Sequence, residues 1–213
     1  MDVFKFNHTN IYVFSDPHYG HPNICRGVSN WGDNAKTRDF PTLEAMNDAI
    51  VNNIINTIPL DAEVFCLGDW SFGGFDNIVE FRERLPHQNL HLVLGNHDHH
   101  IKRNKHDVQK LFTSVNRMID IHLSIPTPNN GKHLKYNFVA CHFPIASWEN
   151  VRDGVMHIHG HEHWGPEMKI SKGRMMDCGL DGNENFQPYN IMEIVDLLKN
   201  RPKLSLLYED HHI

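Results

Sequence analysis

The chain has 213 residues, of which 40% are hydrophobic and 22% are charged, and its formal net charge is −6. This length suffices for a single domain over residues 1–213 with a sizeable core, and we expect residues 209–213 to form a flexible tail. The negative charge argues against extended binding of nucleic acid on a basic surface. No secretory leader pattern and no apolar run of about 18 residues occurs, so the sequence predicts a cytoplasmic protein without a membrane segment.

The four cysteines, Cys25, Cys66, Cys141 and Cys178, show no Cys-x-x-Cys spacing. At least two of them fall within apolar runs that read as buried strands. A zinc site built on cysteine would need paired residues of this type, so we interpret all four as reduced thiols in the core.

Apolar runs alternate with helical patterns in the first half of the chain. Ile11–Phe14, Val64–Leu67 and Leu92–Leu94 have the length and composition of buried strands. Apolar residues at helical spacing predict one helix over Leu43–Ile58 and a second over Ile78–Leu85, with Asp76 as its cap.

The second half shows alternating apolar and polar residues between Met118 and Cys141, around a turn at 126–131, which predicts an antiparallel hairpin. Further strands are predicted over 156–158, 175–178 and 204–207. A helix is predicted over 191–199, capped by Asn190. Together these patterns predict an α/β fold with mixed sheets.

Metal-ligand residue types stand at the ends of five strands, in Ser15-Asp16-Pro17-His18, Gly68-Asp69-Trp70, Gly95-Asn96-His97-Asp98, Cys141-His142-Phe143-Pro144 and Gly160-His161-Glu162-His163. Loops at the carboxyl ends of neighbouring strands are where open α/β sheets build their sites. Taken singly, each motif is an ordinary turn or a histidine at a strand end. Taken together and in this order, they predict a metal site.

The spacing within the motifs suggests how the ligands converge. In an extended segment, residues at i and i+2 point the same way, so Asp16 and His18 can share one ion, as can His161 and His163. The two oxygens of the Asp69 carboxylate can bridge two cations, and Asn96 offers a neutral oxygen.

These five motifs make the chain resemble the calcineurin-like metallophosphoesterases, over residues 16–163. The resemblance implies a mixed β-sheet sandwich flanked by helices in four layers. It implies that Asp16, His18 and His163 hold one ion, that Asn96, His142 and His161 hold the other, and that Asp69 bridges both. Mixed nitrogen and oxygen donors suit two divalent ions, with Mn as our first expectation and Fe, Ni or Zn as alternatives.

The chain departs from the family pattern after Gly68-Asp69. Many members have a further aspartate three residues on, where this chain has Phe72. The Ser/Thr protein phosphatase branch continues there with Asp-Arg-Gly, and this chain does not.

The resemblance also implies hydrolysis of a phosphoester by a metal-bound hydroxide, with His97 as the proton donor to the leaving oxygen. We expect Asp98 to orient His97 and to raise its pKa. In the loop after the first ligands, Arg26 is a candidate to clamp a phosphate oxygen and Asn23 to hydrogen-bond one. An ordinary solvated loop is the alternative.

The sequence favours a phosphodiesterase acting on a small phosphorylated or nucleotide substrate. A phosphomonoesterase, a nuclease acting on short nucleic acid and a catalytically silent metal-binding scaffold remain alternatives. The retention of all seven ligands argues against the scaffold. The sequence leaves open the physiological substrate, the identity of the metal, the oligomeric state and the pathway.

Overall fold

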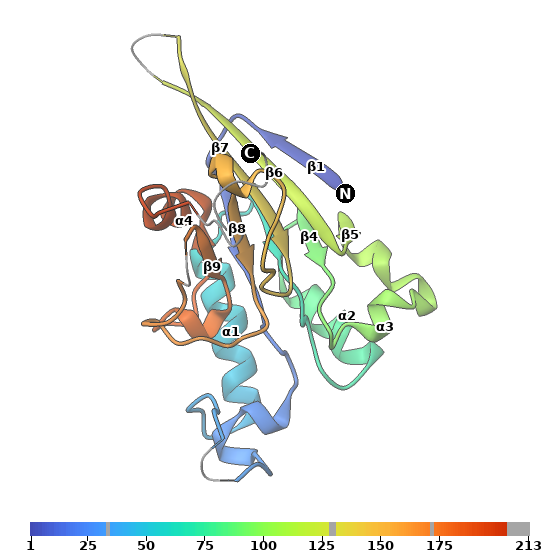
Figure 1. The fold of residues 1–213 in the computed structure, drawn as a ribbon. Helices are drawn as coiled ribbons and strands as arrows, with labels where there is room; N and C mark the ends of the chain where they lie inside the picture. The colour runs from blue at the N-terminus through green and yellow to red at the C-terminus, as the bar shows by residue number, and fades with distance from the viewer. Residues whose placement is uncertain (33–34, 128–130, 171–172, 204–213) are drawn as a thin grey trace.

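The structure, a computed structural model, describes residues 1–32, 35–127, 131–170 and 173–203. Within these ranges the chain forms two five-stranded sheets, with strand orders β10-β2-β3-β4-β5 and β1-β6-β7-β8-β9. Figure 1 shows the two sheets packed face to face. The general α/β prediction, two mixed sheets with helices, is therefore confirmed.

The first sheet carries the early strands and is mostly parallel. Strands β2, β3, β4 and β5 run parallel, and β10 pairs antiparallel with β2. Their bounds are β2 Ile11–Phe14, β3 Glu63–Cys66, β4 Leu90–Val93, β5 Ser114–Asn116 and β10 Tyr189–Asn190. The central strands are apolar on both faces because helices cover one face and the second sheet covers the other.

The second sheet is built around the predicted hairpin. Strands β6 and β7 pair antiparallel, with Met118 opposite Cys141. Strand β1 pairs parallel with β6. On the other side of the hairpin, β8 pairs parallel with β7, and β9 pairs parallel with β8. The bounds are β1 Asp2–Phe6, β6 Met118–Pro126, β7 His133–Cys141, β8 Met156–His159 and β9 Met175–Asp177. Residues 128–130 of the predicted turn lie outside the described residues, as do the predicted strand at 204–207 and the tail.

Helices α1 (Leu43–Thr57) and α2 (Phe75–Arg84) pack on the first sheet through buried residues such as Ile50, Ile54 and Phe81. The expected cap of α2 is wrong. Gly74 occupies the N-cap with a φ of 101°, and Asp76 lies in the first turn. There its carboxylate still favours the helix, because the N-terminal end of a helix carries partial positive charge.

The remaining helices are short. Helix α3 spans His99–Lys102, and α4 spans Ile191–Leu198 with Asn190 as its cap, as predicted. The apolar face of α4 completes the core between the sheets at the edge formed by β9 and β10. All four cysteines are free and buried, in agreement with their interpretation as core thiols. No helix within the described ranges has the length and apolar character needed to cross a membrane.

Candidate metal centre

The seven predicted ligands come together in space. They lie on loops that follow five strands: Asp16 and His18 after β2, Asp69 after β3, Asn96 after β4, His142 after β7, and His161 and His163 after β8. Parallel strands end at the same edge of their sheet, and here the edges of both sheets meet. Local pattern therefore located the residues, and the sheet topology gathers them.

The first donor group consists of Asp16, His18 and His163, which offer ligand atoms within 4.8 Å of one another. The Nε2 atoms of His18 and His163 are 3.1 Å apart. Each lies 3.8 Å from Oδ1 of Asp16. One carboxylate oxygen and two ring nitrogens thus converge from loops on both sheets.

The second donor group consists of Asp69, His142 and His161, whose ligand atoms also lie within 4.8 Å of one another. Oδ1 of Asn96 joins this group, 2.9 Å from Nε2 of His142 and 2.9 Å from Nδ1 of His161. The carbonyl of Leu67 accepts from Nδ1 of His142 at 2.8 Å. In the neutral imidazole this contact fixes the proton on Nδ1 and leaves the lone pair of Nε2 for a ligand.

Asp69 lies between the two donor groups. Its Oδ2 atom is 3.5 Å from Nε2 of His18 and 3.5 Å from Nε2 of His142. Its Oδ1 atom accepts a 2.8 Å hydrogen bond from the backbone of His97. The carboxylate is therefore within reach of both donor groups.

The backbone of the ligands is unusual. Five ligands have positive φ: Asp16 at 55°, His18 at 48°, Asp69 at 54°, His161 at 76° and His163 at 50°. Residues other than glycine adopt this left-handed region rarely and at an energetic cost, and such residues cluster at functional sites.

The expected extended geometry of Asp16 and His18 is therefore wrong. The two side chains converge through left-handed backbone at both residues. The loop after β3 holds this segment, because the carbonyl of Asp69 accepts a 3.0 Å hydrogen bond from the backbone N–H of His18. The same correction applies to His161 and His163, which also lie in the left-handed region.

Two glycines allow the loops to approach closely. A Cβ on Gly160 would lie 1.9 Å from Oγ of Ser15 and 2.3 Å from Oδ2 of Asp16. A Cβ on Gly95 would lie 2.2 Å from Oδ1 of Asp69. Any side chain at either position would displace a ligand carboxylate, so these glycines are required for close approach.

The residues present fit divalent cations. Oδ1 of Asp16 is buried and has no hydrogen-bond partner among the described residues, although two imidazole nitrogens face it. A buried carboxylate oxygen without a partner is costly, and a cation would compensate it. The mixed nitrogen and oxygen donors suit Mn, Fe, Ni or Zn.

The electrostatics of the second donor group favour positive charge. Burial opposes the protonation of His142, but its hydrogen bond to Asp69 and the charges of Asp16 and Asp69 outweigh burial and raise the pKa of His142 to about 9. Burial also opposes ionisation of Asp69, yet His142 and His18 lower the pKa of Asp69 to about 2. The carboxylates thus provide a negative potential that a cation would neutralise.

Asp98 has a different role from the one predicted. Its carboxylate accepts from the backbone N–H groups of Gly95, Asp69 and Trp70 at 2.8 to 2.9 Å, and it makes no hydrogen bond to the His97 side chain. Burial and the nearby Asp69 charge raise the pKa of Asp98 to about 6. The prediction that Asp98 orients His97 is wrong, because the carboxylate faces the loop after β3. It joins that loop to the loop after β4.

The two residues expected to bind phosphate lie elsewhere. Arg26 forms an exposed ion pair with Asp39 at 3.1 Å. Oδ1 of Asn23 accepts from the backbone of Asn30 at 3.1 Å. Neither residue contacts a candidate ligand, so the structure favours the alternative interpretation of a solvated loop that holds itself together.

Sequence reasoning missed a buried ion pair that supports the first donor group. Arg38 donates to both oxygens of Asp181, at 2.9 and 2.7 Å, and to the carbonyls of Asp16 and Pro17. Oδ2 of Asp181 in turn accepts from Nδ1 of His163 at 2.8 Å. A carboxylate that orients a metal-ligating histidine in this way is a recurrent feature of metal sites.

No local pattern points to this arrangement. Arg38 and Asp181 are 143 residues apart in the sequence, and neither stands in a recognisable motif. Arg38 is only 3% exposed, so its role is to hold the loop of Asp16 and to fix Asp181 rather than to meet a ligand from solvent.

Comparisons with known proteins give no activity. No family model matches the chain. It is 29% identical to the uncharacterized protein MJ1445 of Methanocaldococcus jannaschii over 155 residues. The matched segment covers 72% of this chain and 69% of that protein. It is similar to the crystal structure of AQ665, a protein of unknown function from Aquifex aeolicus, with a TM-score of 0.56, 19% identity, and coverage of 92% of this chain and 100% of that one. The second likeness supports the fold alone.

The Asp181→Asn variant should weaken Mn²⁺ binding about 10- to 100-fold at one of the two donor groups, because His163 loses the charge that orients it. Isothermal titration calorimetry resolves the two affinities, and thermal unfolding checks that the chain still folds. Asp39→Asn, which breaks the exposed pair with Arg26, is the matched control and should leave both affinities unchanged. Equal weakening at both groups would contradict this role of Asp181.

Proposed function

We propose that the chain is a dinuclear metal-dependent phosphodiesterase of the calcineurin-like metallophosphoesterase type, with the four-layer architecture of that family. The observation that supports this most is the position of Asp69, whose Oδ2 atom is equidistant from a histidine of each donor group. Two separate mononuclear sites would not need a shared carboxylate. Phosphoester hydrolysis is the chemistry for which paired divalent ions are widely used.

The chain would hold one ion through Asp16, His18 and His163 and the other through Asn96, His142 and His161, with Asp69 between them. When bound, a pair of divalent ions supplies an activated water nucleophile and stabilises the charge of an in-line phosphoryl transition state. The protein's contribution is to keep these donors fixed, through Asp98 on one side and the Arg38–Asp181 pair on the other.

His97 is the proposed proton donor. Its backbone is held by Asp69, and its ring centroid lies 5.2 Å from that of His18, so the imidazole borders the first donor group. The imidazole is partly exposed and makes no hydrogen bond to a described residue, which leaves it available to a substrate. A ring N–H in this position would transfer its proton to the leaving oxygen as the phosphorus–oxygen bond breaks.

The surroundings favour a diester over a monoester. A cavity of about 370 Å³ opens beside His97, and none of the described residues that line it is Lys or Arg. Arg38 is already committed to Asp181 and to backbone carbonyls. Apart from the metal ions, no Lys or Arg in this described lining would compensate the second negative charge of a monoester dianion, whereas a diester carries one charge.

Reconstitution with Mn²⁺ should yield two metal ions per chain, as measured by elemental analysis. Asp69→Asn should reduce occupancy at both donor groups because the carboxylate contacts both, whereas His18→Ala should reduce chiefly one. A wild-type protein that binds no more than one Mn²⁺ per chain would rule out the dinuclear centre.

The Mn²⁺-loaded protein should hydrolyse bis-p-nitrophenyl phosphate with a kcat/KM higher than that for p-nitrophenyl phosphate by about tenfold or more, a difference of about 1.4 kcal/mol in transition-state stabilisation. The two substrates share a leaving group, so their comparison measures the preference for a diester over a monoester. The reverse preference would make the chain a phosphomonoesterase. Loss of all hydrolysis with both metals present would support a binding scaffold.

The His97→Ala variant should slow hydrolysis of a diester with an alkyl leaving group about 10²- to 10⁴-fold, while a p-nitrophenyl leaving group should be affected far less. Nitrophenolate departs without protonation, whereas an alkoxide needs the proton that His97 supplies. Metal content is measured in parallel to exclude loss of ligands. Equal slowing of both substrates at full occupancy would assign His97 to positioning instead of proton transfer.

A further inference from the structure

Three aromatic rings that contact one another in series, which we call the aromatic surface, border the first donor group. Trp31 is 47% exposed and Phe72 is 40% exposed, with the buried ring of His21 between them. The centroids of His21 and Phe72 are 4.1 Å apart with nearly parallel planes, and that of Trp31 lies 5.8 Å from His21. Single exposed aromatic residues are normal on protein surfaces, whereas a group of apolar rings in contact is typical of a binding site.

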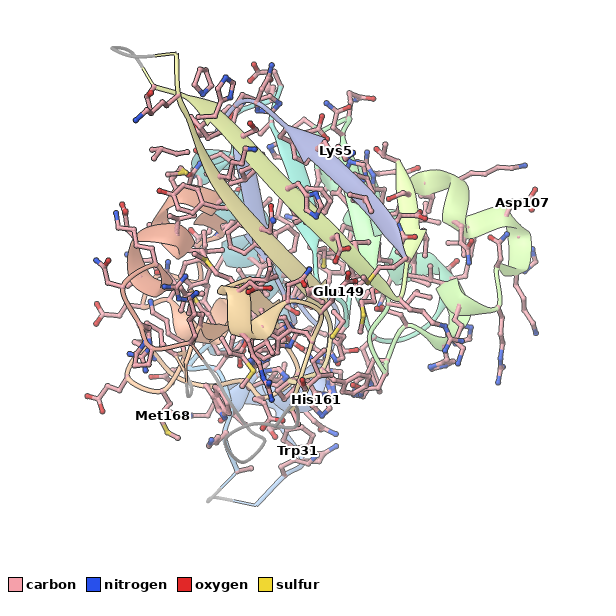
Figure 2. The ribbon with its side chains drawn as sticks, turned by 45° about the horizontal axis from the view of Figure 1, so that its top comes forward. Lys5, Trp31, Asp107, Glu149, His161 and Met168 are labelled. Carbon is pink, nitrogen blue, oxygen red and sulfur yellow. The ribbon has the colours of Figure 1, made fainter. Side chains whose placement is uncertain are left out.

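This aromatic surface, formed by His21, Trp31 and Phe72, lies next to the proposed reaction centre. The centroid of His21 is 5.6 Å from that of the candidate ligand His18. His97, the proposed proton donor, lies 6.1 Å from Phe72 by ring centroid. Figure 2 places Trp31 at the same end of the molecule as His161, at the opposite end from Lys5. Only the ring of His21 therefore separates a group stacked on Phe72 from the candidate ligand His18.

Phe72 and His97 also line the cavity of about 370 Å³, together with Ser71, Gly73 and Gly74. Its volume is near the lower end of the range for small-molecule sites, roughly 300–1,000 Å³. The Ser71 hydroxyl is buried and has no hydrogen-bond partner among the described residues. The cavity thus combines the aromatic ring of Phe72, open space beside Gly74 and the unpartnered hydroxyl of Ser71.

We propose that the aromatic surface stacks a nucleobase, so that the substrate is a small nucleotide phosphodiester. This inference rests on the proposed phosphodiesterase function. Aromatic side chains bind bases by stacking without requiring one sequence, because every base has a planar π face. The absence of Lys and Arg from the described cavity lining, with a net charge of −6, argues for a short substrate over a polynucleotide.

The test compares two diesters with the same leaving group. Thymidine 5′-(p-nitrophenyl phosphate) carries a base on the retained side, and methyl p-nitrophenyl phosphate carries none. The ratio of their kcat/KM values measures recognition of the nucleoside. We expect the wild-type ratio to exceed one and Phe72→Ala to reduce it about 5- to 100-fold, in line with the stacking of a single base. Phe72→Trp should preserve the ratio because it keeps an aromatic face.

Phe143→Ala is the matched control. Phe143 is 45% exposed and contacts the second donor group, with its centroid 4.9 Å from His142 and 4.8 Å from His161. The inference requires the ratio to survive this substitution. A ratio that falls in Phe143→Ala and not in Phe72→Ala would place the base on the opposite side of the centre and overturn the assignment.

A binding measurement separates failure of this inference from failure of the proposed function. Thymidine 3′,5′-cyclic monophosphate, which has the single negative charge of a diester, should quench tryptophan fluorescence in the wild type, and its affinity should fall in Phe72→Ala. A chain that hydrolyses neither diester but binds this nucleotide through Phe72 would retain the stacking site and lose the phosphodiesterase function. A chain that hydrolyses both diesters with a ratio unchanged in Phe72→Ala would retain the function and lose the stacking site. Absence of both hydrolysis and Phe72-dependent binding would overturn both.

Discussion

Buried negative charge is the constraint on which the rest of the site depends. Asp16 is fully buried and Asp69 is 2% exposed, and both carboxylates stand where the loops of the two sheets meet. Ionised carboxylates are costly in such a place unless they are paired or bound to a cation. The four imidazoles that face them, from His18, His142, His161 and His163, are good ligands but weak compensators when neutral. The packing therefore suits a cation, and the close approach of the loops at Gly160 brings these donors together.

The loops that hold these carboxylates are fixed from behind by two further charged groups. Asp98 ties the loop after β3 to the loop after β4 through three backbone N–H groups. Arg38 ties the loop of Asp16 to Asp181, which in turn orients His163. Both groups of hydrogen bonds involve backbone near a ligand with positive φ. This conformation is energetically costly, and it persists because the surrounding contacts stabilise it. In the function that we propose, these fixed donors hold the phosphoester and the partly exposed rings hold a flat group beside it.

Much of the fold follows from local sequence pattern. The apolar runs, the hairpin from Met118 to Cys141 and the cap at Asn190 were predictable because strand periodicity and helix capping depend on residues a few positions apart. The cap of α2 was mispredicted for the same reason: Gly74 and Asp76 both suit a helix start, and only the path of the chain decides between them. The positive φ of Asp16 and His18 was also out of reach, since residues other than glycine adopt it only where tertiary contacts impose it.

The sequence by itself determined which residues can bind metal, because ligand chemistry belongs to side-chain type and the strand ends that present them are marked by local pattern. Tertiary structure alone decided what supports them. In the folded chain the Asp98 carboxylate faces the loop after β3, and Arg26 lies on the surface. Arg38, which is buried, forms the ion pair with Asp181. These outcomes depend on the direction of each side chain and on contacts between residues as far as 143 positions apart. Such contacts are set by the packing of two sheets against each other, and no local pattern records them.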